Sequence, residues 1–256
     1  YNRKDFSDFN NKVIFDVQFD KATIASNDLN YFYNEFGKNN VFYVDTHLIG
    51  TLNNFTTHNL KLVDKNQSEI VGTANFRNLF GKGNQEFYMK GNFDRITSNY
   101  EDLKSILPRI LGSNLPSVLA KLGNVNIAGD VELTQKYINA NVTMLSQLGY
   151  LEGNLAMQNI NNIDNASYQG NIKLDAFDLG TLLSQNDIGK ASLDLDVDGK
   201  GFTQKLLNTA IKGKIEKFYY NGYNYQNITV DGSMKMPYYK GYFNSNDPNL
   251  KMDFDG

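Results

Sequence analysis

The chain has 256 residues and a formal net charge of −3, with acids and bases interspersed and without cysteine or tryptophan. This charge balance excludes the basic stripe of a nucleic-acid-binding protein, and the lack of cysteine excludes disulfides and thiolate metal sites. Sixteen tyrosines, 17 phenylalanines and 21 glycines against four prolines favour strands and turns. Neither a run of 18 apolar residues nor a signal peptide occurs, so we expect a piece of a longer chain that carries any anchor elsewhere.

Strands and short helices are predicted along the first half of the chain. Residues 12–20 alternate between apolar and other side chains, which predicts a strand, and about four further strands are predicted over 41–93. Helical spacing predicts helices over 27–36, 99–111 and 116–122. The second of these is expected to begin at a capping box formed by residues 98–101.

The stretch from Leu174 to Gly199 combines a strand end, a short helix and a second strand. Asp178 is placed to cap a helix over 178–185, and Gly189 is available to end it. Residues 193–198 then alternate between aliphatic residues and aspartate, the period of a strand with one apolar and one polar face. The same alternation in neighbouring segments brings the total to about fourteen strands.

An internal repeat organises these elements. Asp-Leu pairs open the helices at residues 28, 102 and 178, roughly 75 residues apart. We predict one continuous segment over 1–256, built from helix-plus-strands units that start near residues 24, 96 and 174. The alternative is that a common dipeptide recurs by chance.

The predicted fold class is all-β: an elongated, curled, repetitive β-sheet groove with a few short helices at a groove end or edge. A sandwich with a dry core is the alternative, since fourteen one-sided strands must cover their apolar faces in some way. Small residues on the inner face favour the groove, because they suit curvature and leave room. They are Gly72, Gly91, Gly129, Gly153, Gly170, Gly213 and Gly232. Flexible methionines suit a surface that accepts variable partners, at Met144, Met157, Met234 and Met236.

The alternation also predicts which side chains line the groove. Register fixes the face of a whole strand, so the neighbours of each lining residue are predicted to face water. The predicted lining residues are Val125, Ile127, Val131, Leu133, Ile138, Val142, Met144, Leu155, Met157, Ile172, Leu174, Leu193, Leu195, Val197, Ile228, Val230, Met234 and Met236.

A family resemblance rests on three adjoining segments: 168–174 (YQGNIKL), 177–183 (FDLGTLL) and 195–201 (LDVDGKG). With these segments the chain resembles the TamB proteins of the bacterial cell envelope, within the wider AsmA-like group, and is most similar to those of the Bacteroidetes. The resemblance covers about residues 96–256, where 228–232 (ITVDG) and 253–256 (DFDG) also fit.

The resemblance implies a function and a location. It implies a periplasm-spanning bridge that carries phospholipids between the inner and outer membranes and supports outer-membrane assembly, with phospholipid acyl chains in the groove. It also implies an inner-membrane anchor and an outer-membrane barrel partner of the TamA or BamA type. Because the anchor and the barrel-binding region of the family are lacking here, those contacts would be made by regions outside this chain.

Other functions find less support in the sequence. A calcium loop starting at Asp194 would need a glutamate where Lys205 stands, and His47 and His58 lack metal-ligand spacing. Asp175 and Asp178 could form a glycosidase pair, but acids on a polar strand face are usually solvated. We therefore expect no enzyme activity, no cofactor and no nucleic-acid partner. A structural or adhesive β-repeat stalk with a dry core is the alternative function.

Overall fold

The structure, a computed structural model, describes residues 6–32, 37–79, 86–106, 112, 115, 117–160, 162, 165–201, 206–235 and 237–256. Its contacts divide the chain into two compact units. Unit 1 comprises residues 1–115 and 124–135, and unit 2 comprises residues 116–123 and 136–256.

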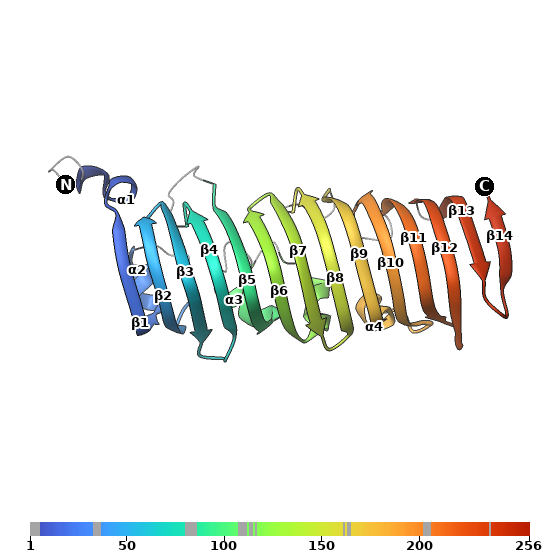
Figure 1. Cartoon of the computed structure of the whole chain (residues 1–256), viewed down its shortest axis with the longest axis horizontal. Coiled ribbons are helices and arrows are strands. Elements are labelled where there is room, and N and C mark those ends of the chain that lie inside the picture. The colour runs from blue at the N-terminus through green and yellow to red at the C-terminus, as the bar shows by residue number, and fades with distance from the viewer. Residues whose placement is uncertain are drawn as a thin grey trace. The chain divides into compact units, whose positions relative to one another are not determined.

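Unit 1 is an antiparallel sheet of six strands with short helices at its start and at one end of its strands (Figure 1). Its strands follow one another in sequence order, and each pairs with the next. The helices are η1 (Phe6–Asp8), α1 (Phe9–Lys12), α2 (Ser26–Phe32) and α3 (Tyr100–Ile106). The strands are β1 (Phe15–Ala25), β2 (Val41–Thr51), β3 (Asn54–Asp64), β4 (Glu69–Arg77), β5 (Tyr88–Asn99) and β6 (Asn124–Thr134).

Unit 2 repeats this arrangement with eight strands, again antiparallel and in sequence order. Its helices are η2 (Ser117–Leu122) and α4 (Leu179–Leu183). Its strands are β7 (Tyr137–Ser146), β8 (Gly149–Gln158), β9 (Ser167–Asp178), β10 (Ile188–Lys200), β11 (Asn208–Tyr220), β12 (Tyr223–Lys235), β13 (Tyr238–Asn246) and β14 (Lys251–Asp255).

The all-β prediction is confirmed. The described residues form fourteen strands, the strand pairings within each unit are antiparallel between consecutive strands, and the few helices are short. Within each unit the sheet is an open single layer, because its first and last strands do not pair with each other. No second sheet therefore covers either face of a unit within the described ranges. The helices α2 and α3 are each followed along the chain by four strands.

The helix boundaries differ from the predicted ones at specific residues. Asp178 caps α4 as predicted, since its carboxylate accepts from the Thr181 backbone N–H at 2.9 Å. The helix ends at Ser184, whose φ of 57° supplies the left-handed turn, and Gly189 instead lies in β10.

Helix α3 begins at Tyr100, one residue later than the predicted start at residue 99. Asn99 caps it by accepting from the Asp102 N–H at 3.0 Å, while the Ser98 hydroxyl remains in β5 and contacts the Ser68 hydroxyl at 2.9 Å. Parts of the predicted helices lie outside the described residues, namely 33–36, 107–111 and 116. In the region of the third predicted helix, η2 begins at Ser117.

The core of unit 1 lies where α3 meets the apolar face of the sheet. Ile106 of α3 packs with Phe42 and Val44 of β2 and with Leu60 of β3, and all four side chains are buried. Asn40 ties this end together, because its side chain donates to the Ser105 carbonyl oxygen at 3.2 Å and its N–H donates to the Ser26 hydroxyl at 2.9 Å. The short helix thus closes one end of the apolar face in unit 1.

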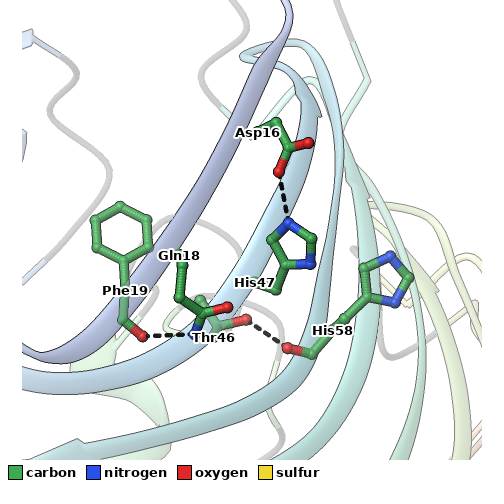
Figure 2. A network of polar contacts seen from close by, with 6 residues as sticks. All are labelled: Asp16, Gln18, Phe19, Thr46, His47 and His58. Carbon is green, nitrogen blue, oxygen red and sulfur yellow. Dashed lines mark hydrogen bonds and ion pairs between the residues drawn. The ribbon is translucent and has the colours of Figure 1, made fainter.

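The opposite face of unit 1 carries polar side chains that contact one another, among them the histidines (Figure 2). His47 Nε2 lies 2.6 Å from a carboxylate oxygen of Asp16, and the His47 and His58 rings, directly opposite each other on β2 and β3, have centroids 6.2 Å apart. Thr46 points to the other face and is buried, and its hydroxyl donates to the His58 carbonyl oxygen at 2.9 Å across a β-bulge. Polar side chains here satisfy the backbone and one another.

Candidate functional site

The apolar face of unit 2 is the largest feature that the sequence pattern and the structure share. Directly opposed residues of antiparallel strands share a face, so the register defines rows of side chains that cross the sheet. One row runs Val142, Gly153, Ile172, Leu195, Gly213, Val230 and Phe243. A second row runs Met144, Leu151, Leu174, Leu193, Ile215 and Ile228. These rows bring the predicted lining residues of unit 2 onto one continuous surface.

The predicted lining residues differ in how deeply they are buried. Buried side chains are Val125, Leu133, Met144, Leu174, Ile228 and Val230. Half-buried ones are Ile127, Val131, Ile138, Val142, Leu155, Met157, Ile172, Leu193, Leu195, Val197 and Met234. Met236 lies outside the described residues. Because most are only half-buried in a single-layer sheet, the face retains apolar area that the described residues do not cover.

Unit 1 also has an apolar face, to which its last strand, β6, contributes the predicted lining residues of this unit. Leu133 lies opposite Met89 of β5, which in turn lies opposite Phe76 of β4, and Ile127 lies opposite Ile96. The rings of Phe55 and Phe76 stack with centroids 5.3 Å apart. Apolar rows therefore occur in both units.

The other face of unit 2 carries charged and amide rows. Asn171, Asp196, Lys212 and Asp231 stand in register, and the Lys212 ammonium lies 2.7 Å from the Asp231 carboxylate. The Asn171 amide donates to both Asp194 and Asp196, at 2.9 and 3.1 Å. Most neighbours of the lining residues are exposed, but Thr134 and Ser192 are buried.

Glycines on the apolar face fall into two kinds. Gly213 has a φ of 147°, and a methyl group there would collide with the Asp194 backbone carbonyl oxygen. Gly153 has ordinary strand geometry, and a methyl group there would make a normal contact with Leu151 at 3.5 Å. Of the seven predicted inner glycines, Gly72, Gly129 and Gly170 also adopt the positive φ that only glycine tolerates well. At Gly72, Gly170 and Gly213 the backbone of the adjacent strand therefore approaches closely.

One end of the apolar face in unit 2, which we call the helix end, is covered by α4 and η2. Phe177, Leu148 and Leu122 are buried there, and the Gln147 N–H donates to the Leu122 carbonyl oxygen at 3.0 Å. Lys121 of η2 donates to the Leu182 carbonyl oxygen at 2.8 Å and to the Ser184 hydroxyl, which satisfies the end of α4. The helices therefore close this end over β7 to β10.

Asp247 ties β12 to the connection that follows β13 at the same end. Its side chain is fully buried, with 0% exposure, and it accepts from the Tyr223 hydroxyl at 2.9 Å and from the backbone N–H groups of Gln226 and Asn249 at 2.9 and 2.8 Å. Burial raises the pKa of Asp247, but these hydrogen bonds outweigh burial and hold the pKa below its ordinary value. The ionised carboxylate is thus part of the folded structure.

This contact predicts an acid dependence of stability. Because the pKa of Asp247 is lower in the folded than in the unfolded chain, its stabilising contribution is present above the unfolded pKa of about 4 and is lost as pH falls through the folded pKa. We expect Asp247→Asn to lower the thermal midpoint at pH 7 by several degrees. Between about pH 5 and pH 3, the thermal midpoint of the variant should fall less than that of the parent. Scanning calorimetry over that range measures both effects, and Asp253→Asn, which removes an exposed carboxylate, is the control. Equal pH profiles for the parent and Asp247→Asn would contradict the assignment.

Several residues of this face escaped the sequence analysis. The rows add Ile211 and Ile215 of β11 and Phe243 of β13, which alternate in the same way and could have been assigned by that signal. Phe218 and Tyr225 stand opposite each other at the helix end, in line with Ala191. A buried role for Asp247 could not have been predicted, because an acid between Asn246 and Pro248 looks like part of a solvated turn.

The acids singled out in the sequence have structural partners. Asp175 accepts from the Ser192 hydroxyl at 3.2 Å, and Asp178 caps α4, where the Thr181 hydrogen bonds hold its pKa below the ordinary value. Asp194 lies on a strand and not in a loop. Among the described residues, no group of three His, Asp or Glu side chains is placed to hold a metal ion.

The chain was compared with protein-family models, curated proteins and solved structures. No protein-family model, curated protein or solved structure matches this chain. Within the part of the chain that the structure describes, no helix has the length and apolar character needed to cross a membrane.

Proposed function

We propose that this chain is a segment of a lipid-transfer bridge of the TamB kind, which carries phospholipids between the inner and outer membranes and supports outer-membrane assembly. The observation that carries the proposal is the apolar face of unit 2, whose rows of aliphatic side chains and glycines cross all the strands from β7 to β13 in one register. Acyl chains are the occupant that such a face suits, because each CH₂ moved from water onto it contributes about 0.8 kcal/mol.

Two further features support a lipid rather than a dry core. Glycines and half-buried aliphatic residues stand where a packed sandwich would need bulky, buried ones, as at Gly153 between Val142 and Ile172. The alternation of apolar with polar or charged residues along the strands, as in Leu195 and Asp196, keeps most polar groups away from the proposed acyl path.

The family resemblance supplies the remaining parts of the proposal. The phospholipid path would run through the periplasm, the anchor would lie in the inner membrane, and an outer-membrane barrel protein of the TamA or BamA type would bind regions outside this chain. The proposed role needs no catalytic group and no cofactor, because transfer along the face changes no covalent bond.

A paired photo-crosslinking experiment tests the proposal. A photoreactive amino acid at position 195 should give phospholipid adducts in cells, identified by mass spectrometry after lipid extraction, whereas one at position 196 should give none. Leu195 and Asp196 are adjacent residues of β10 on opposite faces, so expression and location are matched. Adducts only at position 196, or purified protein without extractable lipid, would sink the proposal, and the latter result would favour the dry-core stalk.

A further inference from the structure

The two ends of the apolar face in unit 2 differ in charge. The helix end mixes acids with bases, including Asp178, Asp187 and Lys190, and contains α4 and Asp247. The opposite end carries Lys200, the last residue of β10, Lys235, the last residue of β12, and Lys240 of β13, all exposed. We call this opposite end the lysine end.

The lysines of this end lack acidic partners. Lys200, Lys235 and Lys240 form no ion pair with any described residue, whereas Lys212, nearer the middle of the strands, pairs with Asp231 at 2.7 Å. Asp198 is the nearest acid on the same face of β10, and it too forms no ion pair within the described part of the chain. The lysine end of unit 2 therefore presents an excess of positive charge.

The lysines are also close enough to act together. Lys200 and Lys235 both stand opposite Asn208 of β11, so their backbones are two strand spacings apart, about 10 Å. Lysine side chains have four-carbon stems, and at the last positions of β10 and β12 they can bend around the strand ends towards the apolar side. Two ammonium groups could thus contact one phosphate at the rim of the face.

The apolar face is more polar next to the lysines than in the rows of aliphatic side chains farther along the strands. The row next to the lysines runs Tyr168, Gly199, Thr209, Met234 and Tyr239, with two phenols and a hydroxyl. The row from Leu174 to Ile228, nearer the helix end, is aliphatic, and the last row at that end, from Phe177 to Tyr225, is mostly aromatic. Tyrosine suits a boundary at which one end of the ring is apolar and the other is wet. This contrast matches an amphipath whose anionic headgroup lies at the lysine end and whose tails lie on the aliphatic rows.

We infer that unit 2 binds anionic phospholipids in one orientation, with the phosphate at Lys200, Lys235 and Lys240 and the acyl ends towards the row of Leu193, Ile215 and Ile228. This inference rests on the proposed lipid-binding function and adds the polarity and headgroup class of the ligand. Its recognition is electrostatic, since each lysine near an anionic surface contributes roughly a factor of five in affinity at moderate salt.

The orientation can be read with single tryptophans, because the chain contains none. Met234→Trp at the lysine end and Ile215→Trp towards the helix end replace half-buried residues of the same face, about 20 Å apart along β12 since Ile215 stands opposite Ile228. Phosphatidylglycerol brominated near the headgroup should quench Met234→Trp more strongly, and phosphatidylglycerol brominated near the chain ends should quench Ile215→Trp more strongly. Equal or reversed profiles would overturn the orientation.

The headgroup class is tested with a matched charge change. Replacing Lys200, Lys235 and Lys240 together by Gln should weaken phosphatidylglycerol binding about 10- to 100-fold at low salt and leave phosphatidylcholine binding unchanged. The control replaces Lys173, Lys214 and Lys251 by Gln, which removes the same charge elsewhere on unit 2. Equal losses in the two triple variants would overturn the headgroup site alone. A parent protein that binds neither lipid would instead overturn the proposed function.

Discussion

Gly213→Ala should destabilise the protein by about 3 kcal/mol, while Gly153→Ala should change its stability by less than about 1 kcal/mol. Both glycines lie in the same row of the apolar face, so hydrophobicity and location are matched. The difference comes from the backbone: Gly213 has a φ of 147° and an added methyl group would collide with the Asp194 carbonyl, whereas Gly153 leaves ordinary room for a methyl group. Urea unfolding followed by circular dichroism measures both values.

The two variants separate two roles of glycine on this face. If glycine served only to leave space for a ligand, both alanine variants would keep their stability and both would bind less lipid. We expect instead that Gly213→Ala mainly lowers the free energy of unfolding. Gly153→Ala should mainly reduce the space for lipid on the apolar face and so weaken lipid binding. Similar free energies of unfolding for the two variants would contradict the strained geometry of Gly213.

Leu195→Asp should reduce lipid binding by about tenfold or more and block transfer through the whole protein, whereas Asp196→Leu should spare both. Leu195 stands between Ile172 and Gly213 in the middle of the apolar face, and a carboxylate there must be solvated or neutralised at a cost of several kcal/mol. Titration with a fluorescent phospholipid measures the binding, and outer-membrane integrity reports the transfer.

Folding is the main confounder, and the structure guides the choice of site. Val230 is only 4% exposed, so Val230→Asp would bury a charge within the sheet and is expected to unfold the strand. Leu195 is half-buried, which lets a carboxylate reach water in the lipid-free protein. Lipid binding by a folded Leu195→Asp protein at parental affinity would end the conduit interpretation.

The strands could be predicted well, because their signal is local and strong. In β10 three aliphatic residues alternate with three aspartates, and a one-residue slip would exchange the faces of the whole strand. The positions of the bends could not be predicted, because φ depends on how closely the adjacent strand approaches. Gly170 and Gly153 look alike in sequence, yet only Gly170 lies against the backbone of Asn154.

Helix ends were predicted less accurately for a related reason. Gly189 looked like the end of α4, but Ser184 adopts the left-handed conformation and accepts from Lys121 of η2, a contact 63 residues apart in sequence. Likewise Ser98 resembles an N-cap, but its contact with Ser68 of the preceding β3–β4 connection keeps it in the strand and leaves capping to Asn99. Tertiary contacts decided both cases over local propensity.

The pairing of each strand only with its neighbours in sequence has a consequence for how this architecture can change in length. Within a unit, removing or adding two adjacent strands leaves every other strand with its direction and its apolar side intact, and only the two flanking strands change partner. A single strand cannot be lost in this way, because every later strand would then run in the opposite direction. The hairpin is thus the smallest piece by which such a sheet can be lengthened or shortened without reversing its later strands.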